Sequence, residues 1–180
     1  MVGTLSKNKR QIEAIQCVEK LIADGILATL TICGSGLQEN ELKNYVRKNN
    51  LTKYIDFTGN INNVTELRKT MDVAFVCSTN EALGRVTVEA SYYENLIIGS
   101  RNGFTPYIVK DKKTGLLYEQ GNIDDMVSCI KFAIENMDQT KEMIKFAKND
   151  AIKKFSKNIS VKIEDFLSHC IEQERTDRCA

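Results

Sequence analysis

The sequence predicts an α/β protein with a doubly wound parallel sheet and extra helices at its carboxyl end. Apolar residues alternate between strand-like runs and helix-like spacing as far as residue 119, and this alternation is typical of parallel sheets with helices on both faces. Beyond Gly121 the spacing is only helical. Glycines follow the carboxyl ends of four predicted strands, which indicates one loop-rich edge.

The predicted elements follow one another without a linker or an internal repeat, so we expect a single domain over residues 1–180. Strands are assigned to short runs of apolar and β-branched residues, and helices to longer amphipathic stretches. In chain order these are a strand over 1–5, a helix over about 9–24, a strand over 27–33, a helix over 37–49, a strand over 54–58, a helix over 64–70, a strand over 72–77, a helix over 85–94, and strands over 96–99 and 116–119. The final helices are expected over 123–136, 139–155 and 159–174.

Composition excludes several classes of function. The net charge is +1, with 42% hydrophobic and 27% charged residues, which offers no electrostatic field for nucleic acid. No apolar run is long enough to span a membrane, and the first residues lack a signal segment, so a cytoplasmic location is expected.

Side chains that could hold a metal or a disulfide are scattered. His169 is the single histidine, and no cluster has the spacing of a metal site or of a Ser/His/Asp triad. The six cysteines show no C-x-x-C spacing, and we expect reduced thiols: Cys17, Cys33, Cys77, Cys129, Cys170 and Cys179.

The most informative stretch joins Glu81 to Glu89 across Gly84. It leads from the carboxyl end of the strand over 72–77 to the start of the helix over 85–94, which is where open α/β sheets bind ligands. Free amides at a helix start favour an anion, and a glycine allows a phosphate to approach the backbone. Glu89 lies roughly 6 Å further along the helix axis and can accept hydrogen bonds from hydroxyl groups beside such a phosphate.

Two other interpretations of nearby motifs are weaker. Gly34-Ser35-Gly36 opens like a dinucleotide fingerprint, but Glu39 stands where the third glycine is needed, which disfavours a nicotinamide or flavin enzyme. Ser78 and Glu81 have the spacing of a capping box, but Gly84 favours a helix that begins later.

Six short motifs in order resemble the C-terminal half of retaining GT-B glycosyltransferases of the glycosyl transferase group 1 family. The likeness runs over nearly the whole chain, and its most specific part is the E-x7-E spacing followed by Ala90. The motifs are Val2-Gly3-x-Leu5-Ser6-x-x-Lys9, Ile32 to Gly36, Phe57-Thr58-Gly59, Ser78 to Ala90, Gly103 to Pro106, and Thr114 to Tyr118.

This resemblance implies a Rossmann-like domain that binds a nucleoside diphosphate sugar without a cofactor or a metal. Glu89 would bind the ribose hydroxyls, and Glu81 would bind the transferred sugar as a catalytic residue. Lys9, the second catalytic residue, would hold the diphosphate together with the amides of Leu83, Gly84, Arg85 and Val86. The loop of Gly59, Asn60 and Ile61 would border the base. The implied activity is that of a hexosyltransferase in polysaccharide or glycoconjugate biosynthesis.

The sequence departs from the family pattern at two positions. Thr4 stands where the family usually has an arginine at the diphosphate, for which Arg10 or Arg85 would have to compensate. Tyr107 replaces a common glutamate, in a loop to which we assign a structural role.

The family also has an N-terminal acceptor domain, which is absent from these 180 residues and through which any peripheral membrane association would run. We therefore expect the isolated chain to be inactive, and expect the last helix to present an apolar stripe of Ile163, Phe166, Leu167, Cys170 and Ile171. Two alternatives stay open: a non-catalytic nucleotide-sugar-binding module or subunit, and one half of a nucleotide-sugar epimerase.

Overall fold

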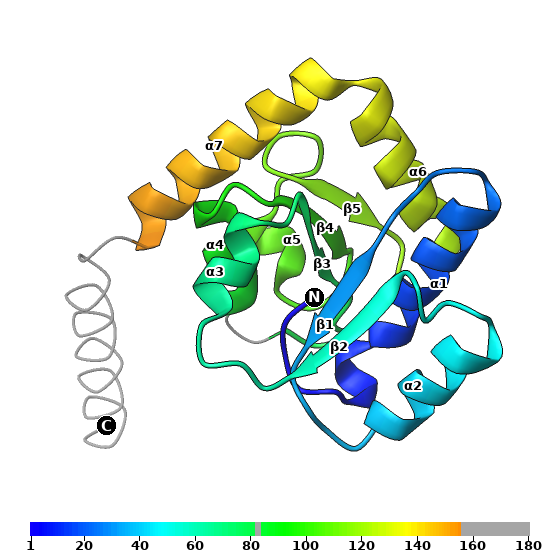
Figure 1. Ribbon diagram of the computed structural model, residues 1–180. Helices are drawn as coiled ribbons and strands as arrows, with labels where there is room; N and C mark the ends of the chain where they lie inside the picture. Colours follow the sequence, from blue (N-terminus) through cyan, green and yellow to red (C-terminus); the bar gives the residue numbers. More distant parts are fainter. Residues whose placement is uncertain (82–83, 156–180) are drawn as a thin grey trace, which may run out of the picture.

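Parallel strands alternate with helices along the chain, as the sequence predicts (Figure 1). The computed structural model describes residues 1–81 and 84–155. Its strands are β1 (Leu30–Cys33), β2 (Ile55–Gly59), β3 (Val73–Val76), β4 (Leu96–Ser100) and β5 (Leu116–Tyr118). Its helices are the 3-10 turn η1 (Lys7–Lys9), then α1 (Gln11–Ala23), α2 (Glu39–Lys48), α3 (Val64–Lys69), α4 (Arg85–Tyr92), α5 (Thr105–Ile108), α6 (Ile123–Glu135) and α7 (Met137–Phe155).

The predicted first strand over residues 1–5 is wrong, and the expected single sheet is divided. Residues 1–5 make one isolated parallel bridge, between Val2 and Cys33, and then follow the loop after β1. The described strands consequently form two parallel sheets, β1-β2 and β3-β4-β5 (Figure 1). A run of apolar residues indicates strand propensity, but a strand also needs partner edges along its length, and residues 1–5 have a partner only at β1.

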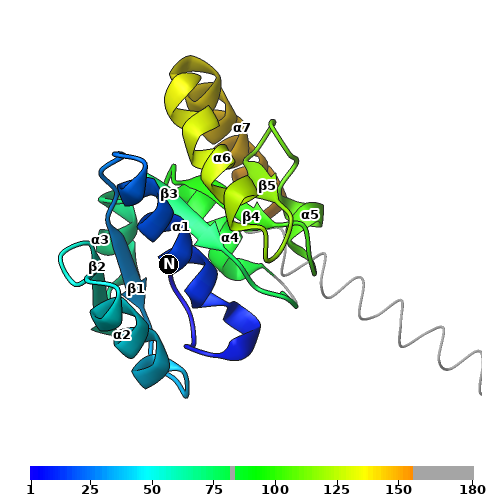
Figure 2. The ribbon, with the colours of Figure 1, turned by 90° about the vertical axis from the view of Figure 1, so that its right-hand side faces the viewer.

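The second sheet is covered on both faces, as expected of a doubly wound fold (Figure 2). Alternate residues of β3, β4 and β5 point to opposite faces. One set, which includes Phe75, Ile98 and Tyr118, packs in the main core with α1 and α6. The other set, which includes Val76, Ile97 and Leu117, packs with Ala90 of α4. These two layers fix the position of the loops at the strand ends.

The helix bounds agree with the predicted ones to within two residues, and two short helices, η1 and α5, were not predicted. α5 is a four-residue helix that we did not predict, and it contains Tyr107, which we placed in a loop. α7 begins at Met137 rather than at residue 139. Asparagine side chains cap two helices: Asn63 accepts from the Glu66 amide at the start of α3, and Asn122 from the Asp125 amide at the start of α6.

Several predictions can be compared with the described residues only in part. Cys17, Cys33, Cys77 and Cys129 are free thiols, as expected. Burial raises the pKa of Cys17 and of Cys77 to about 12 and that of Cys129 to about 11, so these thiols stay protonated at neutral pH. No helix among the described residues has the length and apolar character needed to cross a membrane. The helix predicted over 159–174, with its apolar stripe and His169, lies outside the described residues, as do Cys170 and Cys179.

Candidate functional site

The candidate site lies on the edge formed by the carboxyl ends of the strands, which we call the rim. Lys9 at the end of η1 and Glu81 in the loop after β3 meet here, with 2.7 Å between the lysine Nζ and a carboxylate oxygen. Both side chains are largely buried. The two residues that the sequence analysis named as catalytic are therefore in direct contact, although 72 positions separate them.

Asn8 fixes the position of this pair, and the sequence analysis did not identify it. Its side chain donates to the Asn80 carbonyl oxygen and accepts from the Asn80 amide, both at 3.0 Å. Its backbone carbonyl accepts from the Thr79 amide at 2.8 Å. Three hydrogen bonds thus hold the loop after β3 against the residue that precedes Lys9. The only sequence feature that could have identified Asn8 is its polar side chain, directly before the predicted Lys9.

Gly84 ends this loop and caps helix α4. It has the left-handed conformation, with φ of 59°, and its carbonyl accepts from the Val88 amide, so the helix starts where the sequence predicts and Ser78 is not its cap. A Cβ at Gly84 would lie 2.1 Å from Cδ1 of Ile108, so the end of that side chain would have to move to accommodate any other residue. The chain around Gly84, Arg85 and Val86 opens α4, whereas Leu83 lies outside the described residues.

Glu89 lies in the second turn of α4 and is paired with a cation. Nη2 of Arg68, from α3, is 3.2 Å from a carboxylate oxygen of Glu89. The arginine side chain is 4% exposed and the carboxylate 55% exposed, so one side of Glu89 remains open to solvent. This pair was not predicted, because Arg68 precedes Glu89 by 21 residues on another helix.

Arg10 follows Lys9 and has an unusual backbone conformation with a buried partner. Its φ is 46°, in the left-handed region that non-glycine residues rarely adopt. Its guanidinium contacts the carboxylate of Glu13, which is 1% exposed and accepts from the Tyr118 hydroxyl at 2.6 Å. Burial raises the pKa of Tyr118, which therefore remains a hydrogen-bond donor. This network anchors the start of α1 to the end of β5.

The loops after β1 and β2 form the next part of the rim. The Asn60 side chain donates to the Ser35 hydroxyl at 2.9 Å, and the Gly34 amide donates to the Gly59 carbonyl at 2.8 Å. A Cβ at Gly34 or Gly36 would lie 2.1 or 2.3 Å from backbone oxygens of residues 3 and 5. These two glycines therefore allow close backbone packing of residues 3–5, a physical role different from that of a dinucleotide fingerprint.

Three predicted or quoted residues lie elsewhere on or near the rim. Thr4 is exposed, and its carbonyl accepts from the Gln11 side chain. Ile61 is half-buried in the loop after β2. Tyr107 is 69% exposed and stacks on Phe104, with ring centroids 5.2 Å apart. The Phe104 amide donates to the Glu81 carbonyl, so this aromatic pair borders the Lys9–Glu81 contact.

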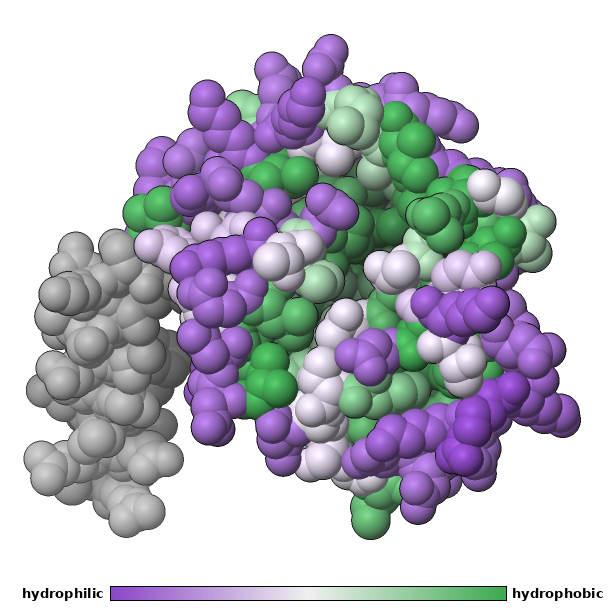
Figure 3. All heavy atoms as spheres, viewed as in Figure 1, coloured by the Kyte–Doolittle hydropathy of each residue, from purple (hydrophilic) through white to green (hydrophobic). Residues whose placement is uncertain are grey.

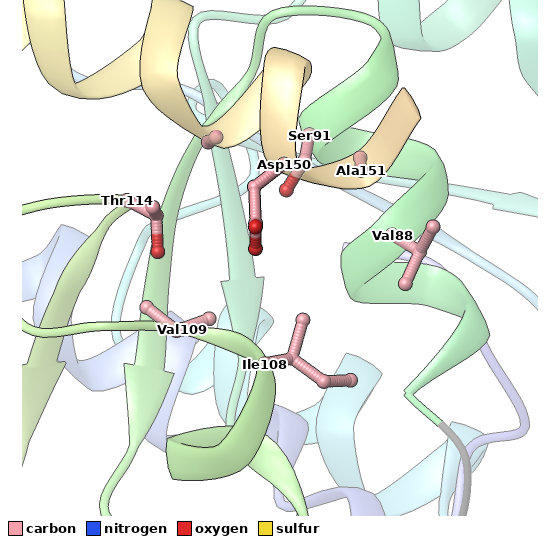
Figure 4. Close-up of a pocket in the computed structure, with 8 residues that line it drawn as sticks. Val88, Ser91, Ile108, Val109, Thr114, Asp150 and Ala151 are labelled. Carbon is pink, nitrogen blue, oxygen red and sulfur yellow. The ribbon is translucent and has the colours of Figure 1, made fainter. Parts of the chain in front are cut away.

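Two described cavities lie away from the rim. A very small one, about 10 Å³, lies between α4, α5 and α7 and is lined by Val88, Ile108 and Asp150 among others (Figure 4). It has room for at most one water molecule. A much larger one, about 680 Å³, lies between β1 and β3 at the amino ends of the strands. Among the described residues, no group of three or more His, Cys, Asp or Glu side chains could hold a metal ion.

Comparison with known proteins identifies related sequences and folds. The family model of glycosyl transferases group 1 matches residues 1–150. N-acetyl-alpha-D-glucosaminyl L-malate synthase from Bacillus anthracis is 27% identical over 121 residues, which are 67% of this chain and 32% of that enzyme.

Solved structures share the fold. Anabaena HepE in complex with UDP superposes with a TM-score of 0.83 at 24% identity, over 93% of this chain and 48% of that one. The C-terminal domain of a glycosyl transferase group 1 family protein, LpcC from Francisella tularensis, superposes with a TM-score of 0.75 at 20% identity, over 86% of this chain and 83% of that one. The chain thus spans about a third of the curated relative and about half of HepE.

Proposed function

The chain belongs to the glycosyl transferases group 1 family, and we propose that it is the donor-binding half of a retaining enzyme of this family. The single observation that carries the proposal is the contact of Lys9 with Glu81 at the rim, beside the amino terminus of α4. This arrangement puts a cation, a carboxylate and free helix amides together, which suits a diphosphate that carries a sugar.

We assign each group a role from its place. Lys9 and the amides at Gly84, Arg85 and Val86 would bind the diphosphate. Glu81, adjacent to Lys9, would accept hydrogen bonds from hydroxyls of the transferred sugar. The open side of Glu89 would bind the ribose hydroxyls, while Arg68 holds its other side.

The proposed reaction follows from these roles. The bond between the sugar and the diphosphate breaks, and the lysine and the helix amides stabilise the charge that develops on the departing diphosphate. The acceptor hydroxyl attacks from the face that the diphosphate leaves and transfers its proton to the departing diphosphate, so the configuration at the sugar is retained. We propose that no metal is required, because these groups already supply the positive charge.

The acceptor would be held by a part of the enzyme that these residues do not contain. HepE and the Bacillus anthracis enzyme are two to three times as long as the regions that match this chain. We therefore propose that the 180-residue chain alone binds a donor nucleotide but transfers no sugar.

Calorimetry with UDP in the presence of a chelator tests the proposal, since HepE was crystallised with UDP. We expect saturable binding that is about 10- to 100-fold weaker in Lys9→Ala, because a hydrogen bond to a charged group contributes about 1.5–3 kcal/mol. Lys7→Ala, which removes an exposed lysine from the same short helix, is the matched control. Absence of binding to UDP and also to GDP at millimolar concentration would refute the proposal.

A further inference from the structure

Helix α3 carries a buried cation next to the candidate site. The surface over α3 is largely hydrophilic (Figure 3), and its residues Glu66 and Lys69 are exposed and pair with each other at 2.7 Å. Arg68, between them, is only 4% exposed. Among the residues that the structure describes, it is the only basic one that is buried. Basic side chains are almost never fully buried without a partner, so a role for Arg68 is expected at the group with which it pairs.

That partner is Glu89 of α4, the residue to which the proposed function assigns the ribose hydroxyls. Nη2 of Arg68 is 3.2 Å from Oε2 of Glu89. The arginine is enclosed, whereas the Glu89 side chain is 55% exposed, so one side of the carboxylate is open to a ligand. A carboxylate can accept about four hydrogen bonds, and one cation occupies only part of that capacity.

The backbone that carries Arg68 is fixed independently of this contact. The Asn95 side chain, which is buried, donates to the Arg68 carbonyl oxygen at 2.8 Å. The Tyr93 hydroxyl donates to the Thr65 hydroxyl at 3.3 Å. These bonds tie both ends of α3 to the segment that follows α4. The guanidinium of Arg68 therefore approaches Glu89 from a fixed position.

An exposed glutamate on a helix has several accessible rotamers, and a ligand that binds it must fix one of them. A cation held in a fixed position removes this freedom in advance. We infer that Arg68 is a positioning residue: it holds the Glu89 carboxylate in one orientation before the ligand arrives, and so favours nucleotides whose ribose offers two neighbouring hydroxyls. This inference rests on the proposed function, because it needs Glu89 to bind the ribose.

A purely structural role accounts for less of what Arg68 does. An ion pair with a half-exposed carboxylate contributes little to stability, and a buried arginine can often be replaced by an apolar side chain at no cost. Asn95 and Tyr93 already join α3 to the segment after α4. An apolar side chain would not orient the carboxylate of Glu89, and this effect separates the two roles in an experiment.

Two nucleotides make that separation. UDP offers both ribose hydroxyls, whereas 2′,3′-dideoxyuridine diphosphate lacks them and keeps the base and the diphosphate. In Arg68→Met, UDP should bind about 5- to 10-fold more weakly, which corresponds to the rotamer freedom of a free glutamate. The dissociation constant of the dideoxy nucleotide should change by less than about twofold, because this ligand does not use Glu89 and only the loss of one positive charge remains.

A matched control and a second measurement complete the test, all on the full 180-residue chain. Lys69→Met removes an exposed positive charge from the next position of α3 and should leave both dissociation constants unchanged. Arg68→Lys should recover most of the UDP affinity, because an ammonium group can also hold one carboxylate oxygen. Should Arg68→Met fail to fold, NMR couplings of the Glu89 side chain in the ligand-free original chain decide, and they should report a single rotamer.

The possible failures can be told apart. Equal losses for the two nucleotides in Arg68→Met would overturn the inference and leave the proposed function standing. Averaging over several Glu89 rotamers in the ligand-free original chain would have the same meaning. Equal binding of the two nucleotides by the original chain would remove the ribose assignment of Glu89, and the role of Arg68 with it. Absence of UDP binding would instead remove the donor site as a whole.

Discussion

At the scale of single residues, the two acidic side chains of the candidate site have cationic partners of different accessibility. Glu81 contacts Lys9, and both are largely buried, whereas Glu89 contacts the buried Arg68 and keeps an open side. These two cationic partners imply different behaviour of the two glutamates when a ligand binds. A ligand that recruits Lys9 competes with Glu81 for the same ammonium group, while a ligand that binds the open side of Glu89 leaves Arg68 in place.

Replacing Glu81 by Gln should therefore act on the sugar and not on the nucleotide. We expect UDP to bind Glu81→Gln as tightly as the original chain or more tightly, because Lys9 is released from its carboxylate. UDP-glucose should bind about 10-fold more weakly, since one charged hydrogen bond is lost. Titration calorimetry with both ligands measures the difference. Equal losses for the two ligands would contradict this division of roles.

Replacing Glu89 by Ala should weaken UDP binding by about 10- to 100-fold through loss of hydrogen bonds to a charged acceptor. The same change leaves the Arg68 guanidinium without its carboxylate, so unfolding by urea must be measured alongside. Glu94→Ala is the matched control, because Glu94 lies just after the same helix in an exposed pair with Lys148 and such pairs contribute little. Unchanged UDP affinity in Glu89→Ala would exclude the ribose assignment.

At the scale of elements, the start of α4 depends on the left-handed Gly84 and on its contact with Ile108 of α5. Gly84→Ala should lower the free energy of unfolding by more than the roughly 1 kcal/mol that a positive φ alone costs, and it should weaken UDP binding by displacing the helix start. Gly25→Ala measures the conformational cost alone, since Gly25 has φ of 79° and no neighbouring atom lies within 4 Å of the position that its Cβ would take. An equal loss of free energy of unfolding in the two variants would show that the contact with Ile108 does not contribute to it.

The elements also show what the sequence could predict. Alternating periodicity was sufficient for the α/β class and for the bounds of most strands and helices, because these depend on local spacing. Residues 1–5 have strand character but lack a second partner edge, which local spacing cannot reveal. α5 has four residues, too few for a helical period to be recognised.

The sequence predicts individual residues of the candidate site but not the contacts between their side chains. Lys9, Glu81 and Glu89 are each named from the sequence, but the Lys9–Glu81 and Arg68–Glu89 pairs join distant positions. Glu13 occupies a place on α1 where a glutamate is expected to face solvent, and only the hydroxyl of Tyr118 and the guanidinium of Arg10 explain its burial.

At the scale of the whole molecule, the buried amino group of Met1 links stability to pH. Its pKa is lowered from 8.0 to about 6, chiefly by desolvation and also by the charge of Arg68, whereas Cys77 and Cys33 act in the opposite direction. Between pH 6 and 8 the amino group is protonated in more of the unfolded than of the folded chains. Its contribution to stability thus rises with pH across this window and is constant on either side of it.

The expected gain from pH 5.5 to 8.5 is about 2–3 kcal/mol in the free energy of unfolding by urea, at 1.36 kcal/mol per pKa unit. Acetylation of the Met1 amino group removes the titrating group and should abolish the gain. His169→Gln serves as a control for the single histidine, because the ordinary pKa of a histidine falls in the same range. A gain that persists after acetylation would assign the pH dependence to another group.

The open edge of β3 also has a consequence for work at high concentration. Among the described residues this edge has no strand partner, and it lies beside an apolar cavity, so it can pair with a strand of another chain. The protein is therefore expected to associate as its concentration rises, and light scattering over a dilution series would measure this tendency directly.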